Sequence, residues 1–271
     1  MKIKTLFNLL FVTTASHIYC QNISIKADLK MQPSEKINFS TAGIEVSVSK
    51  KIDSVYTFSN STNYSSMHVD YSEMPAIHDD RRFKLANNTF RFSAQLLKST
   101  TFTAELQTVA AFEQHLDISD IFLLGGFEAS RQFNDKNNLT LGVKRSNVFG
   151  KPQWLPFVSY WTKLNFNTEI TIGFPKSEIK WSLHPNSIFK ISNDFNGSFY
   201  HSDFNSGLID FSQMTTALQY ERIVDKNFSV YFKGGYDFNR SYFQTNSDFQ
   251  KTTDFYIENG CNLSISIKYK L

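Results

Sequence analysis

The stretch Cys261-Asn262-Leu263-Ser264-Ile265-Ser266-Ile267-Lys268-Tyr269-Lys270-Leu271 ends the chain and alternates strictly between apolar and polar side chains. Apolar residues occupy the odd positions from 263 to 271, and polar residues occupy the even positions from 262 to 270. Successive side chains of a β-strand point to opposite faces, so this stretch predicts a strand with one apolar and one polar face.

A strand of this form at the C-terminus is typical of the strand that closes an outer-membrane β-barrel. It also resembles the signal that barrel-assembly machinery recognises, here with Leu at the end in place of the more usual Phe. The residues that would carry this assembly signal are Ile265, Ile267, Tyr269 and Leu271.

The N-terminus has the form of a secretory signal. Lys2 and Lys4 precede a short apolar run at residues 6–12. That run is too short to cross a bilayer, which takes about 20 apolar residues. We therefore predict a signal peptide over residues 1–20 and one mature domain over residues 21–271, exported through cleavage of that peptide.

Cysteine and charge exclude several classes of protein. After cleavage behind Cys20, Cys261 is the only cysteine, so neither an intramolecular disulfide nor a thiolate metal cluster can form. The preceding residues 17–19 lack the pattern of a lipoprotein signal. Loss of Lys2 and Lys4 brings 28 basic residues close to balance with 25 acidic ones, which gives no reason to expect nucleic acid as a partner.

Period-two alternation recurs along the whole mature chain, broken by short polar segments. We expect strands within residues 23–31, 44–48, 55–69, 89–96, 102–110, 121–133, 139–143, 154–161, 170–174, 178–183, 189–199, 214–220, 228–238 and 261–271.

This pattern predicts an all-β, antiparallel, up-and-down transmembrane β-barrel of about 14 strands. The segments 44–48 and 170–174 carry the weakest alternation, so 12 strands is the alternative. Short connections alternate with longer ones, the longest being a loop at residues 71–88. An even strand number with short turns on one side places both termini in the periplasm.

A secreted β-sandwich also alternates in this way. Two features favour the barrel. The alternation continues through the whole chain, and aromatic residues such as Tyr56, Trp154, Tyr160 and Tyr236 gather near strand ends, as interfacial girdles require.

Three short strings carry a resemblance to a known family. They are Pro156-Phe157-Val158-Ser159-Tyr160, Ile172-Gly173-Phe174-Pro175-Lys176-Ser177 and Asn196-Gly197-Ser198-Phe199-Tyr200. The chain resembles an uncharacterised outer-membrane β-barrel family of Gram-negative bacteria that bears only a domain-of-unknown-function label. The resemblance implies a barrel in the outer membrane and implies no activity.

The polar face of the strands carries charges of both signs, and these should face the lumen because a charge at the lipid midplane costs about 2–4 kcal/mol. The mixture favours a water-filled passage with weak ion preference, and equally a lumen plugged by paired charges. The lumen-facing candidates are Lys26, Asp28, Lys30, Arg91, Glu105, Lys144, Glu169, Glu178, Lys180, Lys190, Asp194, Glu221, Lys233, Asp237, Lys268 and Lys270.

Two histidine strings, His78-Asp79-Asp80 and His201-Ser202-Asp203, have the composition of metal or triad fragments. Adjacent residues of a strand point to opposite faces, and both strings fall in or beside expected loops, so we interpret them as solvated polar residues. We expect no catalytic residues, no metal and no cofactor.

The sequence thus predicts an outer-membrane barrel that serves as a passive channel or small-solute transporter. The alternative is a structural or interaction barrel with a plugged lumen, and a more remote one is a membrane-interface lipid hydrolase. Expected partners are outer-membrane lipid, the barrel-assembly machinery and a small solute.

Overall fold

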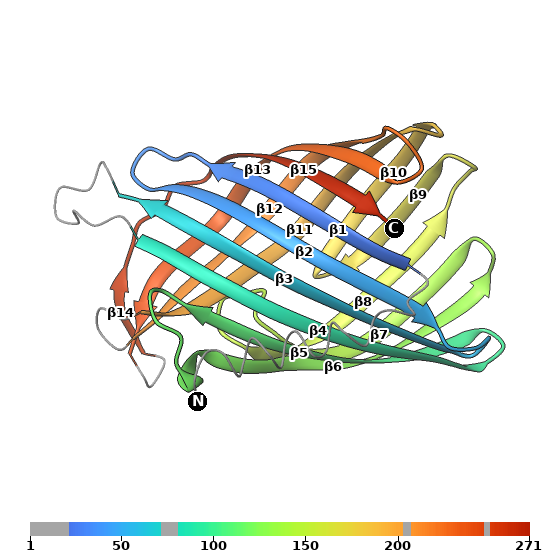
Figure 1. Ribbon diagram of the computed structural model, residues 1–271, viewed down its shortest axis with the longest axis horizontal. Helices are drawn as coiled ribbons and strands as arrows, with labels where there is room; N and C mark the ends of the chain where they lie inside the picture. The colour runs from blue at the N-terminus through green and yellow to red at the C-terminus, as the bar shows by residue number, and fades with distance from the viewer. Residues whose placement is uncertain (1–21, 72–80, 203–206, 247–249) are drawn as a thin grey trace.

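A single antiparallel sheet, closed on itself, forms the molecule (Figure 1). The computed structural model describes residues 22–71, 81–202, 207–246 and 250–271. Fourteen strands, β1 to β13 and β15, make the wall, and the short β14 adds to the end of β13. The predicted barrel of fourteen strands is therefore confirmed, and the alternative of twelve is wrong. The predicted signal peptide lies outside the described residues.

The strand bounds follow the chain in order. The first seven strands are β1 (Asn22–Gln32), β2 (Asn38–Lys51), β3 (Tyr56–Asp70), β4 (Arg81–Leu97), β5 (Thr100–Phe112), β6 (Ile121–Asn134) and β7 (Asn137–Ser146). The others are β8 (Gln153–Lys163), β9 (Thr168–Phe174), β10 (Lys176–His184), β11 (Ser187–Ser202), β12 (Gly207–Ile223), β13 (Phe228–Thr245), β14 (Lys251–Asp254) and β15 (Gly260–Lys270). A 3-10 helix, η2 (Ile118–Asp120), precedes β6. Among the described residues, no helix is long and apolar enough to cross a membrane.

Closure joins the two ends of the chain. The last strand, β15, pairs with β1 on one side and with β13 on the other, both antiparallel. Ala27 of β1 lies opposite Ile267, which in turn lies opposite Val230 of β13. The expected role of the C-terminal stretch as the closing strand is confirmed. Its role as an assembly signal stays a prediction.

The outer face of the barrel is apolar. Leu106, Phe127, Ile172 and Leu263 each expose half or more of their surface. A band of such side chains would be unfavourable in water, and it suits the hydrocarbon region of a bilayer, where each strand shows every second residue to lipid.

The two ends of the barrel differ. At the end where β1 begins and β15 finishes, here called the terminal end, the turns are short, as at residues 98–99, 135–136 and 185–186. At the opposite end, the loop end, most connections are longer, and β9 and β10 are the exception because only residue 175 separates them. The alternation of short and longer connections agrees with expectation.

The expected loop at residues 71–88 is wrong in its second half. Strand β4 begins at Arg81 and pairs with the end of β3, whereas residues 72–80 lie outside the described part. Similarly, β13 continues to Thr245, beyond its expected end. In both places the apolar residues change face. Phe83 is buried and Phe92 is exposed. Their positions differ by an odd number, so alternation places the two side chains on opposite faces of β4.

Strands β7 to β10 end before their neighbours do on the side of the loop end. In Figure 1 their two hairpins occupy only the right-hand part of the barrel, whereas β3, β4 and β13 run further left. Beyond these hairpins β11 meets β5 directly, with His201 opposite Phe112 in a parallel pairing. Phe122 of β6 also packs on Phe199 of β11, with ring centroids 4.1 Å apart. The wall is therefore narrower at the loop end.

The connection between β7 and β8 packs against the loop-end tip of the short β9–β10 hairpin. Phe149 in this connection lies 5.8 Å from Phe174 and 5.5 Å from Phe195, between ring centroids. The backbone also approaches β11 closely, because a Cβ added to Gly197 would lie 2.3 Å from the carbonyl oxygen of Asn147. Only glycine leaves room for this contact.

We predict that Gly197→Ala displaces the β7–β8 connection, since real Cβ atoms do not approach backbone this closely. Amide hydrogen exchange in residues 147–151 should rise several-fold in the variant while the barrel stays closed. Gly234→Ala is the matched control, because its Cβ would meet only Leu263 at 3.5 Å. Equal exchange in both variants would contradict this packing.

Candidate functional site: the interior of the barrel

Most acidic side chains of the polar face contact basic ones on neighbouring strands. Glu105 of β5 accepts hydrogen bonds from Arg91 of β4 and from Lys144 of β7, the latter at 3.3 Å. Lys144 also contacts Glu128 of β6 at 3.0 Å. This network crosses four strands, and its charges largely compensate one another.

A second set of pairs lies on β9 to β13. Lys180 contacts Glu169 at 3.3 Å, and Lys190 contacts Glu221 at 3.6 Å. The remaining contacts in this region are Lys233 to Asp194 at 3.7 Å, Lys176 to Glu178 at 2.8 Å and Lys176 to Asp194 at 4.0 Å. Acid and base are again nearly balanced.

The polar face of β1 and β15 is different. Lys26 and Lys30 on β1 and Lys268 and Lys270 on β15 lie along it, with Lys26 directly opposite Lys268. Within the described ranges, none of the four lies within 4.0 Å of an acidic side chain. We call these four residues the lysine track.

Asp237 is the centre of a buried network. Its carboxylate, which has no exposed surface, accepts hydrogen bonds from Gln32 at 2.7 Å, Thr215 at 2.6 Å and Asn262 at 2.8 Å. Gln32 also donates to Gln213 at 3.0 Å. Asp237 lies on β13 and its partners lie on β1, β12 and β15, so the network joins β1 to β12 and β13, with which β1 does not pair.

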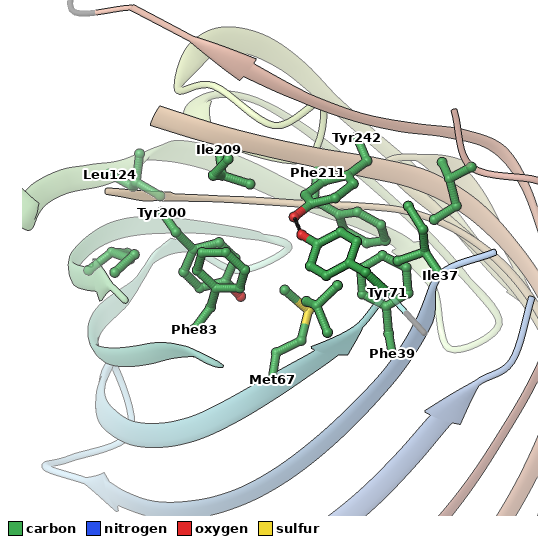
Figure 2. Close-up of a cluster of buried hydrophobic side chains, with 14 residues drawn as sticks. Ile37, Phe39, Met67, Tyr71, Phe83, Leu124, Tyr200, Ile209, Phe211 and Tyr242 are labelled. Carbon is green, nitrogen blue, oxygen red and sulfur yellow. Dashed lines mark hydrogen bonds between the residues drawn. The ribbon is translucent and has the colours of Figure 1, made fainter. Parts of the chain in front are cut away.

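Toward the loop end the interior is apolar. Figure 2 shows side chains from many strands converging in one buried cluster, here called the plug. Its members are Ile37, Phe39, Met67, Val69, Tyr71, Phe83, Val109, Ala111, Leu124, Tyr200, Ile209, Phe211, Tyr242 and Ile257. They are at most 8% exposed, so the interior is filled at this level.

Polar contacts hold the plug together. The hydroxyls of Tyr71 and Tyr242 meet at its centre (Figure 2), and burial raises the pKa of Tyr71, which keeps that hydroxyl neutral. Beside it, Arg81 donates two hydrogen bonds of 2.6 Å to Glu113 and one of 2.6 Å to Ser202. This arginine therefore ties β4 and the β5–β6 connection to β11.

The histidine strings have different outcomes. His201 and Ser202 are the last two residues of β11, beside a connection as expected, but Ser202 is buried, so its interpretation as a solvated residue is wrong. Nδ1 of His201 lies 2.9 Å from the carboxylate of Asp120, whereas Ser202 contacts Arg81 and Glu113. The contacts of the two residues are thus with different partners, as expected for neighbours in a strand. Residues 78–80 and 203 lie outside the described part.

Described residues line two cavities in the interior. The first, about 500 Å³, opens at the terminal end and is lined by Ser24, Glu45, Arg91, Lys268 and Lys270, among others. The second, about 340 Å³, lies deeper, and Lys26, Asp28, Lys30 and Lys233 line it. Met67, Tyr200 and Phe211 also line the second cavity, so it ends at the plug.

The structure brings the candidate residues together as two paired groups, the Asp237 network and the lysine track. Whether they line a path for solute stays a prediction. The sequence analysis missed three further charged residues, Glu45, Glu128 and Lys176. Alternation could have found the first two, because each lies between apolar neighbours and so belongs to the polar face. Also missed were the neutral partners Gln32, Thr215 and Asn262, which no charge pattern reveals.

Comparison with known proteins agrees with the fold. A family model described as Domain of unknown function (DUF6268) matches residues 15–270. The chain belongs to this family. No curated protein matches the chain.

Solved structures of similar shape are outer-membrane barrels. The COG4313 outer membrane channel from Pseudomonas putida F1 shares 7% identity at a TM-score of 0.50, covering 92% of this chain and 94% of that one. The Pseudomonas putida toluene transporter TodX shares 8% identity at a TM-score of 0.44, covering 92% and 88%. The KdgM porin shares 8% at 0.41, covering 91% and 98%. At such identities the likeness concerns the fold alone, which is that of the outer-membrane β-barrels.

We predict that Asp237→Asn destabilises the barrel. All three side-chain partners donate to the carboxylate, so an amide would place its own donor against one of them. The free energy of unfolding in urea should fall by roughly 2–3 kcal/mol, as for loss of a buried charge-assisted hydrogen bond. Asp254→Asn is the control, because Asp254 is 65% exposed and should change stability little. Equal stability of the two variants would contradict the role given to the network.

Proposed function

We propose that the protein is an outer-membrane channel for small solutes whose described conformation is closed at the loop end. The observation that carries this proposal is the division of the interior. Charged, cavity-forming surface extends from the terminal end as far as the plug, and the apolar plug fills the interior beyond it. In a closed state the plug would act as the gate.

The charges of the interior support a hydrated passage. Burying an ion pair away from water costs free energy. A protein in which well-packed apolar side chains replace such a pair is often as stable as the original or more stable. A barrel with a purely structural interior gains little from networks such as Arg91–Glu105–Lys144. Water around these groups removes that cost and leaves room for solute.

The plug also favours a second candidate. A barrel that stays shut would serve as a structural or interaction protein through its connections at the loop end, with the paired charges as internal filling. Conductance separates the two candidates, because only the channel carries current. Neither candidate involves an enzymatic step or a cofactor.

The proposal includes a location. Export through a signal peptide and insertion by the barrel-assembly machinery would place the apolar outer face of the barrel in outer-membrane lipid and both termini in the periplasm. Recovery of the protein from the outer-membrane fraction, as a band whose gel mobility changes on heating, tests this location.

We predict that thinning the plug opens the channel. Phe83 and Tyr200 face each other within the plug, with ring centroids 5.0 Å apart. Phe83→Ala removes a large fully buried ring, and the cavity left behind should raise single-channel conductance in a planar bilayer severalfold. The protein is purified from membranes after expression of the full chain.

The control is Phe232→Ala, which also removes a phenyl ring, but from a side chain that is 50% exposed on the outer face of the barrel. Its conductance should equal that of the parent. If both variants fold as heat-modifiable barrels and Phe83→Ala carries no more current than the parent, the plug is not a gate. No current from any variant would favour the structural barrel.

A further inference from the structure

We propose that the lysine track guides small organic anions to the deeper cavity, and that a hydroxylated carboxylate binds there. This inference rests on the proposed channel function and names its class of solute. The sequence, with charges of both signs on the polar face, favours only a weak ion preference. The three-dimensional arrangement of those charges points to a preference for anions.

The charges of the interior are not evenly distributed. Acids and bases on β4 to β7 and on β9 to β13 lie in mutual contact, so their fields largely cancel. The four lysines of the track have no acidic partner within 4.0 Å in the part of the chain that the structure describes. The four lysines outnumber the acidic side chains that lie beside them, Asp28, Glu45 and Asp237, so the net charge of this wall is positive.

Like charges placed opposite one another across two strands are destabilising. Lys180 and Lys190 face each other in this way across β10 and β11, but each contacts its own glutamate. Lys26 and Lys268 face each other across β1 and β15 without such contacts. Glu45, which lies opposite Lys26 on β2, instead accepts a hydrogen bond from Ser47 at 2.7 Å. A bound anion would relieve this repulsion.

The track borders both cavities. Lys268 and Lys270 line the first cavity at the terminal end, and Lys26 and Lys30 line the second, deeper one. Low-dielectric walls around one sign of charge concentrate counter-ions and speed their entry. An anion that enters at the terminal end therefore meets lysines along its path to the plug.

The deeper cavity has the lining of a site for a polar anion. Lys26 and Lys30 outnumber Asp28 in this lining. Lys233 is paired with Asp194, and Asp237 beside the cavity accepts hydrogen bonds from three side chains. Neutral hydrogen-bonding side chains complete the lining: Gln32, Thr41, Asn196, Ser198, Gln213, Thr215, Gln219, Ser264 and Ser266. Lysines suit a carboxylate, amides and hydroxyls suit sugar-like hydroxyls, and about 340 Å³ is within the range of small-molecule sites.

Calorimetric titration of the purified barrel in detergent tests the site, with glucuronate as the probe and glucose as its uncharged counterpart. We expect glucuronate to bind at least about tenfold more tightly than glucose, since only the former pairs with the lysines. Added salt should weaken glucuronate binding. Equal affinities for the two sugars, or no binding of glucuronate, would overturn the inference.

The double variant Lys26→Gln/Lys30→Gln should weaken glucuronate binding by about tenfold or more. The matched control is Lys98→Gln/Lys136→Gln, which removes the same charge from exposed turns at the terminal end and should bind as the parent does. Equal loss of affinity in both variants would mean that overall charge, and not this site, holds the anion, and would overturn the inference.

Reversal potentials in a salt gradient separate this inference from the channel itself. The parent should prefer anions, and Lys26→Gln/Lys30→Gln should shift the preference toward cations. Current without anion preference or glucuronate binding would overturn the anion site and leave the channel standing. Site-dependent binding without current in any plug variant would overturn the channel and support the anion site.

Discussion

Closure of the sheet is the constraint on which the rest of the structure depends. In hydrocarbon, a backbone N–H or C=O group without a partner costs several kcal/mol, so a membrane-spanning sheet cannot keep an open edge. Pairing of β15 with both β1 and β13 removes the two edges that the chain would otherwise leave. Once the sheet is closed, period-two alternation separates an outer face from an inner one, and the charges collect inside.

The narrowing at the loop end follows from the lengths of the strands. Because β7 to β10 stop short, β11 can meet β5 and β6, and the ring at this level has fewer strands than at the terminal end. A smaller ring has a smaller interior, which side chains can fill. Phe39, Phe83 and Tyr242 fill it, and the Arg81–Glu113–Ser202 contacts hold strands from distant parts of the sequence together around them.

Electrostatics divides the wider part of the interior into two surfaces. Where acidic and basic side chains of neighbouring strands lie within contact distance, as for Lys144 with Glu105 and Glu128, their fields are short-ranged. Where four lysines lie together on β1 and β15, the field extends into the cavities. The same composition, nearly neutral in total, thus gives an interior with one balanced wall and one positive wall.

The sequence by itself determined the strands and the two faces of each strand, and it left their number at 14 or 12, because alternation is a local property that every few residues report. Residues 261–271 even indicate the strand that closes the barrel. The sequence misled where the apolar residues change to the inner face, as at Phe83, since an interrupted alternation has the same form as a loop. Only the tertiary structure decided the plug, the network around Asp237 and the unpaired state of Lys26 and Lys30. These depend on contacts between residues far apart in the chain, such as Gln32 with Asp237, and on distances across a closed sheet that no local pattern encodes.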